Sequence, residues 1–162
     1  MRKQKITVSV IGGHEQNSKV EYNAHEVGKI IGKMGCVLVC GGLKGVMEMS
    51  SRGAREAGGL TIGLLPGTDK ADANPYIDIA LPTSIGFARN ACVACSADII
   101  VALPGSHGTR SEICYGLVWD RPVIDFGGWN IEGMIKAGSL EDLRETLQGL
   151  VDKIHARSSG LE

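Results

Sequence analysis

Two charged residues of the sequence stand where they could bind a ligand and act on it. Arg89, in "GFARNACV", offers the planar guanidinium fork that suits a phosphate or a carboxylate. Glu112, in "LPGSHGTRSE", stands three residues after Thr109 at the predicted start of a helix. That spacing is a capping box, in which Thr109 would cap the helix and Glu112 would occupy its first turn. Because first-turn side chains tilt toward the helix start, Glu112 could equally face a bound ligand, and the spacing alone favours neither role.

A glycine-rich turn supplies a second set of binding groups. The stretch "CGGLKGVME" begins as a strand, turns at Gly41 and Gly42, and enters a helix near Gly45. The free N–H groups of that first turn and the helix dipole would suit a phosphate, and Lys44 could add a positive charge. The alternative is that the glycines only make a tight turn and that Lys44 is solvated. The spacing is neither that of a P-loop nor that of a dinucleotide fingerprint.

Short apolar runs alternate with helical patterns along the chain. Strands are predicted within residues 5–13, 36–42, 60–67, 76–82, 98–105 and 122–128, and helices over 18–35, 46–57, 87–96, 110–119 and 140–157. Runs that are apolar at consecutive positions fit strands buried on both faces. The pattern therefore predicts a doubly wound α/β domain, in which the loops after the strands gather at one edge and bind ligands there. His14 and His107 fall on these loops and are weaker candidates for ligand contacts.

Composition narrows the classes of partner. The 162 residues carry a formal net charge of -1 without a long basic run, which disfavours binding to nucleic acid or to an anionic membrane. No apolar stretch approaches the roughly 20 residues that span a bilayer, and no signal peptide is apparent, so we expect a cytoplasmic protein. The five cysteines all lie in apolar stretches, which predicts reduced, buried thiols. The polar segment 158–162 is expected to be a disordered tail.

Three motifs in this order, "GGLKGVME", "ARN" and "PGSHGTRSE", resemble a superfamily that contains the LOG (Lonely Guy) phosphoribohydrolases and the molybdenum cofactor carrier proteins. The superfamily is distantly related to DNA-processing proteins, and the resemblance covers about residues 6–128. The LOG hydrolases carry the motif P-G-G-x-G-T-x-x-E, which is matched here by Pro104, Gly105, Gly108, Thr109 and Glu112.

Several positions depart from the hydrolase motifs. Ser106 replaces the second glycine of that motif, while Gly86 and Asn90 replace the Met and Lys of M-x-x-R-K, whose arginine is matched by Arg89. In the glycine-rich motif, Cys40 and Glu48 stand at its first and last glycines. These spellings are more similar to the short molybdenum cofactor carrier branch than to the hydrolases.

The resemblance implies a single Rossmann-like domain over 1–162 with a mostly parallel sheet and helices on both faces. It implies a homo-oligomer, dimer or tetramer, that needs no cofactor and binds a phosphorylated pterin or nucleotide-like ligand, most simply the molybdenum cofactor. The alternative is a LOG-type hydrolase that cleaves the N-glycosidic bond of a nucleoside 5'-monophosphate, with Glu112 and Arg89 as catalytic residues. No metal site is expected. The candidate ligand-binding residues are Gly12, Gly13, Gly41, Gly42, Lys44, Gly45, Val46, Met47, Arg89, Asn90, Pro104, Gly105, Ser106, His107, Gly108, Thr109 and Glu112.

Overall fold

A parallel sheet forms the centre of the computed structural model, which describes residues 4–14 and 17–158. Its strand order is β4-β3-β2-β1-β5-β6-β7, and each neighbouring pair runs parallel. The strands are β1 (Thr7–Ile11), β2 (Val37–Cys40), β3 (Leu60–Leu65), β4 (Ile79–Pro82), β5 (Ile99–Ala102), β6 (Val123–Asp125) and β7 (Ile135–Lys136). The doubly wound, parallel α/β architecture predicted from the sequence is confirmed. Only β7 was not predicted, since its two exposed residues form no apolar run.

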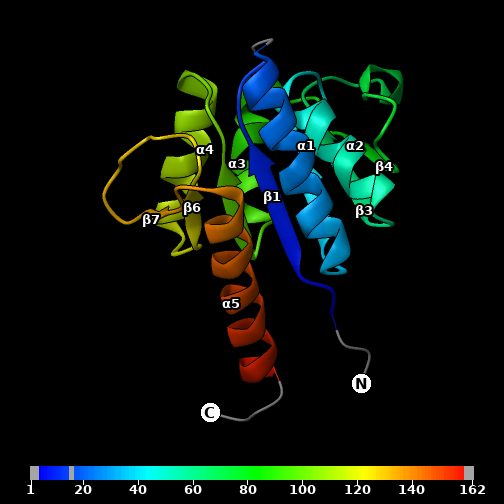
Figure 1. The fold of residues 1–162 in the computed structure, drawn as a ribbon. Helices are drawn as coiled ribbons and strands as arrows, with labels where there is room; N and C mark the ends of the chain where they lie inside the picture. Colours follow the sequence, from blue (N-terminus) through cyan, green and yellow to red (C-terminus); the bar gives the residue numbers. More distant parts are fainter. Residues whose placement is uncertain (1–3, 15–16, 159–162) are drawn as a thin grey trace.

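Helices cover both faces of this sheet. They are α1 (Ser18–Lys33), α2 (Val46–Glu56), α3 (Arg89–Cys95), α4 (His107–Val118) and α5 (Leu140–Ser158), with 3-10 turns at Lys70–Asp72 and Gly86–Ala88. Figure 1 shows α1, α2 and α5 on the near side of β1 and α3 behind it. No helix within the described ranges is both long and apolar enough to cross a membrane.

The central strand β1 contributes to the core on each face. Val8 and Val10 pack into the cluster that includes residues of α1, α2 and α5, whereas Ile11 packs into the cluster of α3 and α4. Ser9, which lies between Val8 and Val10 in β1, is buried and donates its hydroxyl hydrogen to the carbonyl oxygen of Val93 in α3, at 2.7 Å. Both faces of β1 are therefore buried, as the consecutive apolar residues predicted.

Glycines bring α1 and α2 into close contact. A Cβ added at Gly28 would lie 1.9 Å from the carbonyl oxygen of Ser50, and one added at Gly53 would lie 2.0 Å from that of His25. Only glycine fits at such separations, so the backbones of the two helices touch directly. This contact positions α2 against α1, and the first turn of α2 lies at the carboxyl edge of the sheet, which is the upper edge in Figure 1.

The chain changes direction between β1 and β5. The connection after β1 leads to α1 on one face, and the connection after β5 leads to α4 on the other face. The loops stay joined, because the amide of Gly13 donates to the carbonyl oxygen of Pro104 at 2.9 Å and the amide of Val46 donates to that of Gly13 at 3.1 Å. Such a switch point is where open α/β sheets bind ligands.

The structure corrects the expectations that all five cysteines are buried and that residue 158 belongs to a disordered tail. All five cysteines are free, and Cys36 and Cys40 are buried, but Cys95 and Cys114 are exposed. The two exposed thiols lie on outer faces of α3 and α4, which the small-residue composition of those helices did not reveal. Of the tail expected at 158–162, Ser158 is the last residue of α5, and 159–162 lie outside the described residues.

Candidate functional site

A cavity of about 250 Å³ opens at the carboxyl edge, where loops from five segments of the chain converge. Its lining includes more than half of the residues predicted from the motifs. These are Gly12, Gly13, Met47, Arg89, Asn90, Ser106, Gly108, Thr109 and Glu112. Five further residues complete the lining: His14, Leu43, Pro66, Gly86 and Phe87. The motif residues therefore meet in one place although they come from distant parts of the sequence.

The start of α4 differs from the predicted capping box. The helix begins at His107, two residues before the expected cap, and extended Ser106 precedes it without a side-chain cap. Thr109 instead packs against Gly105, four residues earlier, so closely that a Cβ added at Gly105 would lie 2.2 Å from the Thr109 hydroxyl oxygen. Thr109 is thus a first-turn residue and Glu112 lies one turn deeper, so the capping-box interpretation of both residues is wrong.

The helices that start at the cavity differ from those that start elsewhere. The side chain of Asn17 caps α1 and the hydroxyl of Ser139 caps α5, but neither α2 nor α4 has a side-chain cap. In the described part of the chain, the amides of His107, Gly108 and Thr109 have no hydrogen-bond acceptor. Unpaired first-turn amides and the helix dipole make an anion site, which suits a phosphate.

Arg89 is at the start of α3, as predicted, but its fork is already partly engaged. Its Nε donates to the carbonyl oxygen of Leu64 at 2.9 Å, one terminal nitrogen donates to the Asn90 amide oxygen, and the other to the Gly41 carbonyl oxygen at 3.5 Å. Burial lowers the pKa of Arg89, while the nearby Glu112 acts to raise it. A guanidinium has five N–H donors, so two remain for a ligand. Arg89 therefore ties strand ends together and faces the cavity at once.

Glu112 is the most unusual side chain of the site. It is only 7 % exposed, and within the described residues it forms no hydrogen bond or ion pair. Burial raises the pKa of Glu112 to about 8, although the positive charge of Arg89 acts in the opposite direction. At neutral pH the side chain is then mostly a carboxylic acid that can donate a hydrogen bond. A buried polar group without a partner in a cavity marks a place for a ligand.

Asn90 connects α3 to α4 beside this acid. Its amide nitrogen lies 3.4 Å from the carbonyl oxygen of Gly108 and 3.3 Å from the hydroxyl of Ser111, and its oxygen accepts from Arg89. The hydroxyl of Ser111 also donates to the Gly108 carbonyl, at 2.6 Å. Asn90 thereby holds the first turn of α4 next to Arg89, which sets the shape of the cavity wall.

Other predicted residues support the site from outside its lining. Gly42 and Gly45 have positive φ angles of 76° and 68° and turn the chain from β2 into α2. The thiol of Cys40 is buried there and accepts the amide hydrogen of Gly42. Lys44 is exposed on this turn. The predicted residues that the structure places outside the lining are Gly41, Gly42, Lys44, Gly45, Val46, Pro104, Gly105 and His107.

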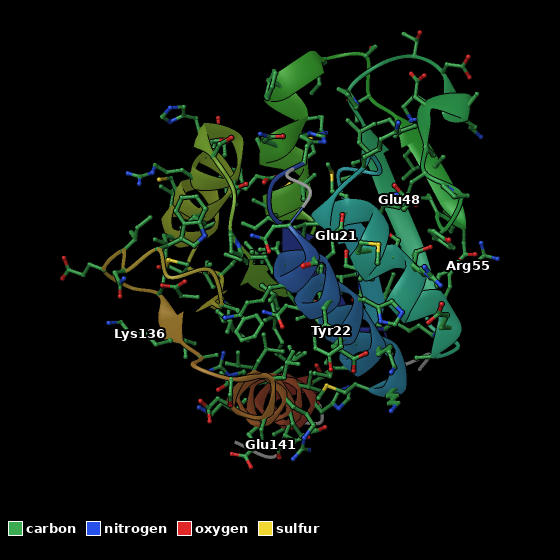
Figure 2. The ribbon with its side chains drawn as sticks, turned by 45° about the horizontal axis from the view of Figure 1, so that its top comes forward. Glu21, Tyr22, Glu48, Arg55, Lys136 and Glu141 are labelled. Carbon is green, nitrogen blue, oxygen red and sulfur yellow. The ribbon has the colours of Figure 1, made fainter. Side chains whose placement is uncertain are left out.

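Pro104 lines a second cavity, of about 470 Å³, on the other side of the β1–β5 loops. The walls of this second cavity come from α1, from the ends of β6 and β7, and from the loop that follows β6. That loop is held by Asp125, whose carboxylate accepts amide hydrogens from Gly127, Trp129 and Asn130. Figure 2 looks onto the edge and shows Glu48, on α2, and Lys136, on β7, on opposite sides of α1.

Sequence reasoning missed the apolar part of the lining. Leu43 and Met47 flank the turn into α2, but only Met47 was included among the candidates. Pro66 follows β3 in "LLPG", one of the glycine-ended strands, so the rule that placed the other loops at this edge could have found it. Phe87 was expected to begin a helix, whereas it lies in the 3-10 turn Gly86–Ala88 before α3.

Replacing Arg89 with alanine should lower the free energy of unfolding by about 2 kcal/mol, because it leaves buried acceptors such as the Leu64 carbonyl unpaired. The matched control is Arg110→Ala, since Arg110 is exposed on α4 and its guanidinium lies over the ring of Trp129. Urea titrations of the two variants and the unsubstituted protein would measure the difference. Equal stability of both variants would show that the contacts of Arg89 contribute nothing to folding.

The sequence and the structure are similar to those of known proteins. The family model described as LDcluster4: SLOG cluster4 family matches residues 5–153. The structure is similar to that of the molybdenum cofactor binding protein from the phototrophic bacterium Rippkaea orientalis, with a TM-score of 0.84 and 34% identity, over 91% of this chain and 98% of that one. It is also similar to the molybdenum cofactor carrier protein of Chlamydomonas reinhardtii, with a TM-score of 0.82 and 28% identity, over 92% and 99% of the two chains.

An enzyme is also among the relatives. The cytokinin riboside 5'-monophosphate phosphoribohydrolase of Mycobacterium tuberculosis is 28% identical over 148 residues, which are 86% of this chain and 75% of the enzyme. The two resemblances noted in the sequence, to carriers and to hydrolases, are thus both found.

Proposed function

The chain belongs to the SLOG cluster4 family, and from that membership we propose that it is a carrier that binds a phosphorylated pterin or nucleotide-like ligand, with the molybdenum cofactor as its cargo. The observation that carries the proposal is the cavity into which the uncapped first turn of α4 opens. The similarity to the proteins of R. orientalis and C. reinhardtii, which bind or carry this cofactor, supports the choice of cargo.

The residues of the cavity fit such a ligand. A phosphate would bind to the unpaired amides of His107, Gly108 and Thr109, and the two remaining N–H donors of Arg89 would add charge. Because burial raises the pKa of Glu112 to about 8, its carboxyl group is mostly protonated at neutral pH, so it would repel the phosphate little and could donate a hydrogen bond to a ring oxygen or nitrogen. The proposal assigns the ligand a charged end and a neutral end, as in a phosphorylated pterin.

Purification should reveal the cargo directly. Native mass spectrometry of freshly isolated protein is expected to show a bound small molecule that is released on denaturation. The released molecule should have the absorbance spectrum of a pterin, and elemental analysis should find molybdenum in it. As a second arm, the empty protein should bind a phosphorylated nucleotide such as GMP, and Arg89→Ala should weaken that binding about 10- to 100-fold. The proposal fails if the isolated protein is empty and binds no phosphorylated ring compound at millimolar concentration.

A hydrolase is the second candidate, and the protonated Glu112 in the cavity is the observation that favours it. A carboxyl group with a pKa near neutrality can protonate a leaving base in its acid form or activate water in its ionised form, and Arg89 could hold the sugar phosphate. We nevertheless expect no release of adenine from AMP, since Ser106, Gly86 and Asn90 depart from the hydrolase pattern. Adenine release by the unsubstituted protein that is lost in Glu112→Gln would establish the enzyme instead.

We further propose that the protein is a homo-oligomer, a dimer or tetramer, that associates through α4. Tyr115 and Trp119 stack there with ring centroids 5.3 Å apart, and Val118 beside them is 73% exposed. Sedimentation velocity at micromolar concentration should show an oligomer that Val118→Asp dissociates, because the charge would be buried on association. Tyr22→Asp, at a site on α1 that is 60% exposed, is the control and should leave the oligomer intact. A monomeric unsubstituted protein would contradict the proposal.

A further inference from the structure

Phe87 lies at the mouth of the cavity, and its aromatic side chain is exposed although it makes no contribution to the core. Its side chain lines the cavity and is 83% exposed, the largest value among the exposed large hydrophobic residues. Transfer of an exposed ring to an apolar contact is favourable, so a ring held in water at a binding site is available for a ligand.

The backbone holds Phe87 in this position. The amide of Gly86 donates to the carbonyl oxygen of Pro66 at 3.0 Å, and the amide of Ser84 donates to that of Gly67 at 2.9 Å. Both residues have positive φ angles, 59° at Gly86 and 60° at Ser84. A left-handed conformation is unusual for serine, so the turn is defined by its contacts with the end of β3.

The ring lies beside the anion site. A Cβ added at Gly108 would be 3.7 Å from the Cε1 atom of Phe87, so the ring edge borders the first turn of α4, where the amides are unpaired. Glu112 is four residues further along the same face of that helix and also lines the cavity. The cavity wall at α4 thus presents three groups in succession. They are the ring of Phe87 beside the helix start, the unpaired amides of the first turn, and the carboxyl group of Glu112.

We propose that Phe87 stacks on a planar heteroaromatic ring of the ligand, and that this contact makes the site select phosphorylated ring compounds over simple sugar phosphates. The inference rests on the proposed function, because it takes the phosphate to bind at α4. Stacking on an aromatic side chain tolerates different heterocycles, since each has a π-face. Phe87 therefore determines the class of ligand, and the polar groups deeper in the cavity choose among its members.

The test compares two probes that share a phosphate but differ in the ring. GMP carries a purine whose six-membered ring has the amino and oxo groups of a pterin, and ribose 5-phosphate has no base. Calorimetric titration of Phe87→Ala is expected to show GMP affinity reduced about 10-fold or more and ribose 5-phosphate affinity changed less than 2-fold. Phe87→Trp should retain GMP binding. Ile85→Ala, at an exposed residue two positions away and outside the lining, is the matched control and should change neither affinity.

Each other outcome overturns the inference in a distinguishable way. Equal losses for both probes would give Phe87 a role in shaping the phosphate site, and an unchanged GMP affinity would remove it from the site altogether. If Phe87→Ala dissociates an oligomer in sedimentation without altering GMP affinity, the ring serves a contact with a second copy. An unsubstituted protein that binds ribose 5-phosphate but not GMP would refute the ring preference alone, whereas one that binds neither would refute the proposed function as well.

Discussion

Glu112→Gln is expected to make the protein more stable at pH 7, by about 3 kcal/mol at most. The fold keeps this buried acid protonated up to a pKa of about 8, whereas the same group in the unfolded chain ionises near its ordinary value of 4.5. Folding at pH 7 must therefore take up a proton, which disfavours the folded state. Glutamine has nearly the same shape and no such requirement, so thermal unfolding of the variant should occur at a higher temperature.

The same substitution should change how stability depends on pH. In the unsubstituted protein, the contribution of Glu112 to the free energy of unfolding is fully present below pH 4.5 and is lost progressively as the pH rises toward 8. The variant should lack that decline between pH 5 and 8, which urea titrations at several pH values would measure. Glu145→Gln, at an exposed position of α5, is the control and should keep it. If the unsubstituted protein and Glu112→Gln show the same pH dependence, Glu112 is not a neutral acid in the fold.

Gly28→Ala is expected to reduce the free energy of unfolding by about 3 kcal/mol or more. Its Cβ would lie 1.9 Å from the Ser50 carbonyl oxygen, and a rigid backbone atom cannot move aside without separating α1 from α2. Since α2 begins at the cavity, we expect weaker binding of GMP as well.

The control for this substitution is Gly149→Ala. Gly149 lies within α5, and an added Cβ would meet no atom within 4 Å. Alanine favours helices relative to glycine, so this variant should be more stable by about 0.5 to 1 kcal/mol. Opposite signs for the two glycine substitutions, measured by urea unfolding, would show that helix contact and not helix propensity explains Gly28. A loss at Gly28 of less than about 1 kcal/mol would contradict this explanation.

The sequence predicted those features that depend on neighbouring residues. Consecutive apolar residues identified six strands, and glycine-ended strands placed the loops at one edge, where Arg89 and Glu112 do meet. The prediction failed where a particular contact, near or distant in the sequence, decides the local structure. Thr109 reads as a cap until its contact with Gly105 is known, and Phe87 reads as helical until its turn is seen to be fixed by the end of β3. Two of the three acceptors of Arg89 are the backbone carbonyl groups of Leu64 and Gly41, which no residue type reveals.

The uncapped starts of α2 and α4 imply that the protein with bound ligand and the protein without it differ in how readily these helix starts unfold locally. A bound phosphate would complete the first turn of α4 and stabilise the folded state in proportion to its concentration over its dissociation constant. Hydrogen exchange of the amides of His107, Gly108 and Thr109 would then report occupancy. Segments that open readily are also the ones that proteases cut. A carrier built in this way would lose its own protection on delivery, so that empty chains are degraded sooner than chains that still hold cargo.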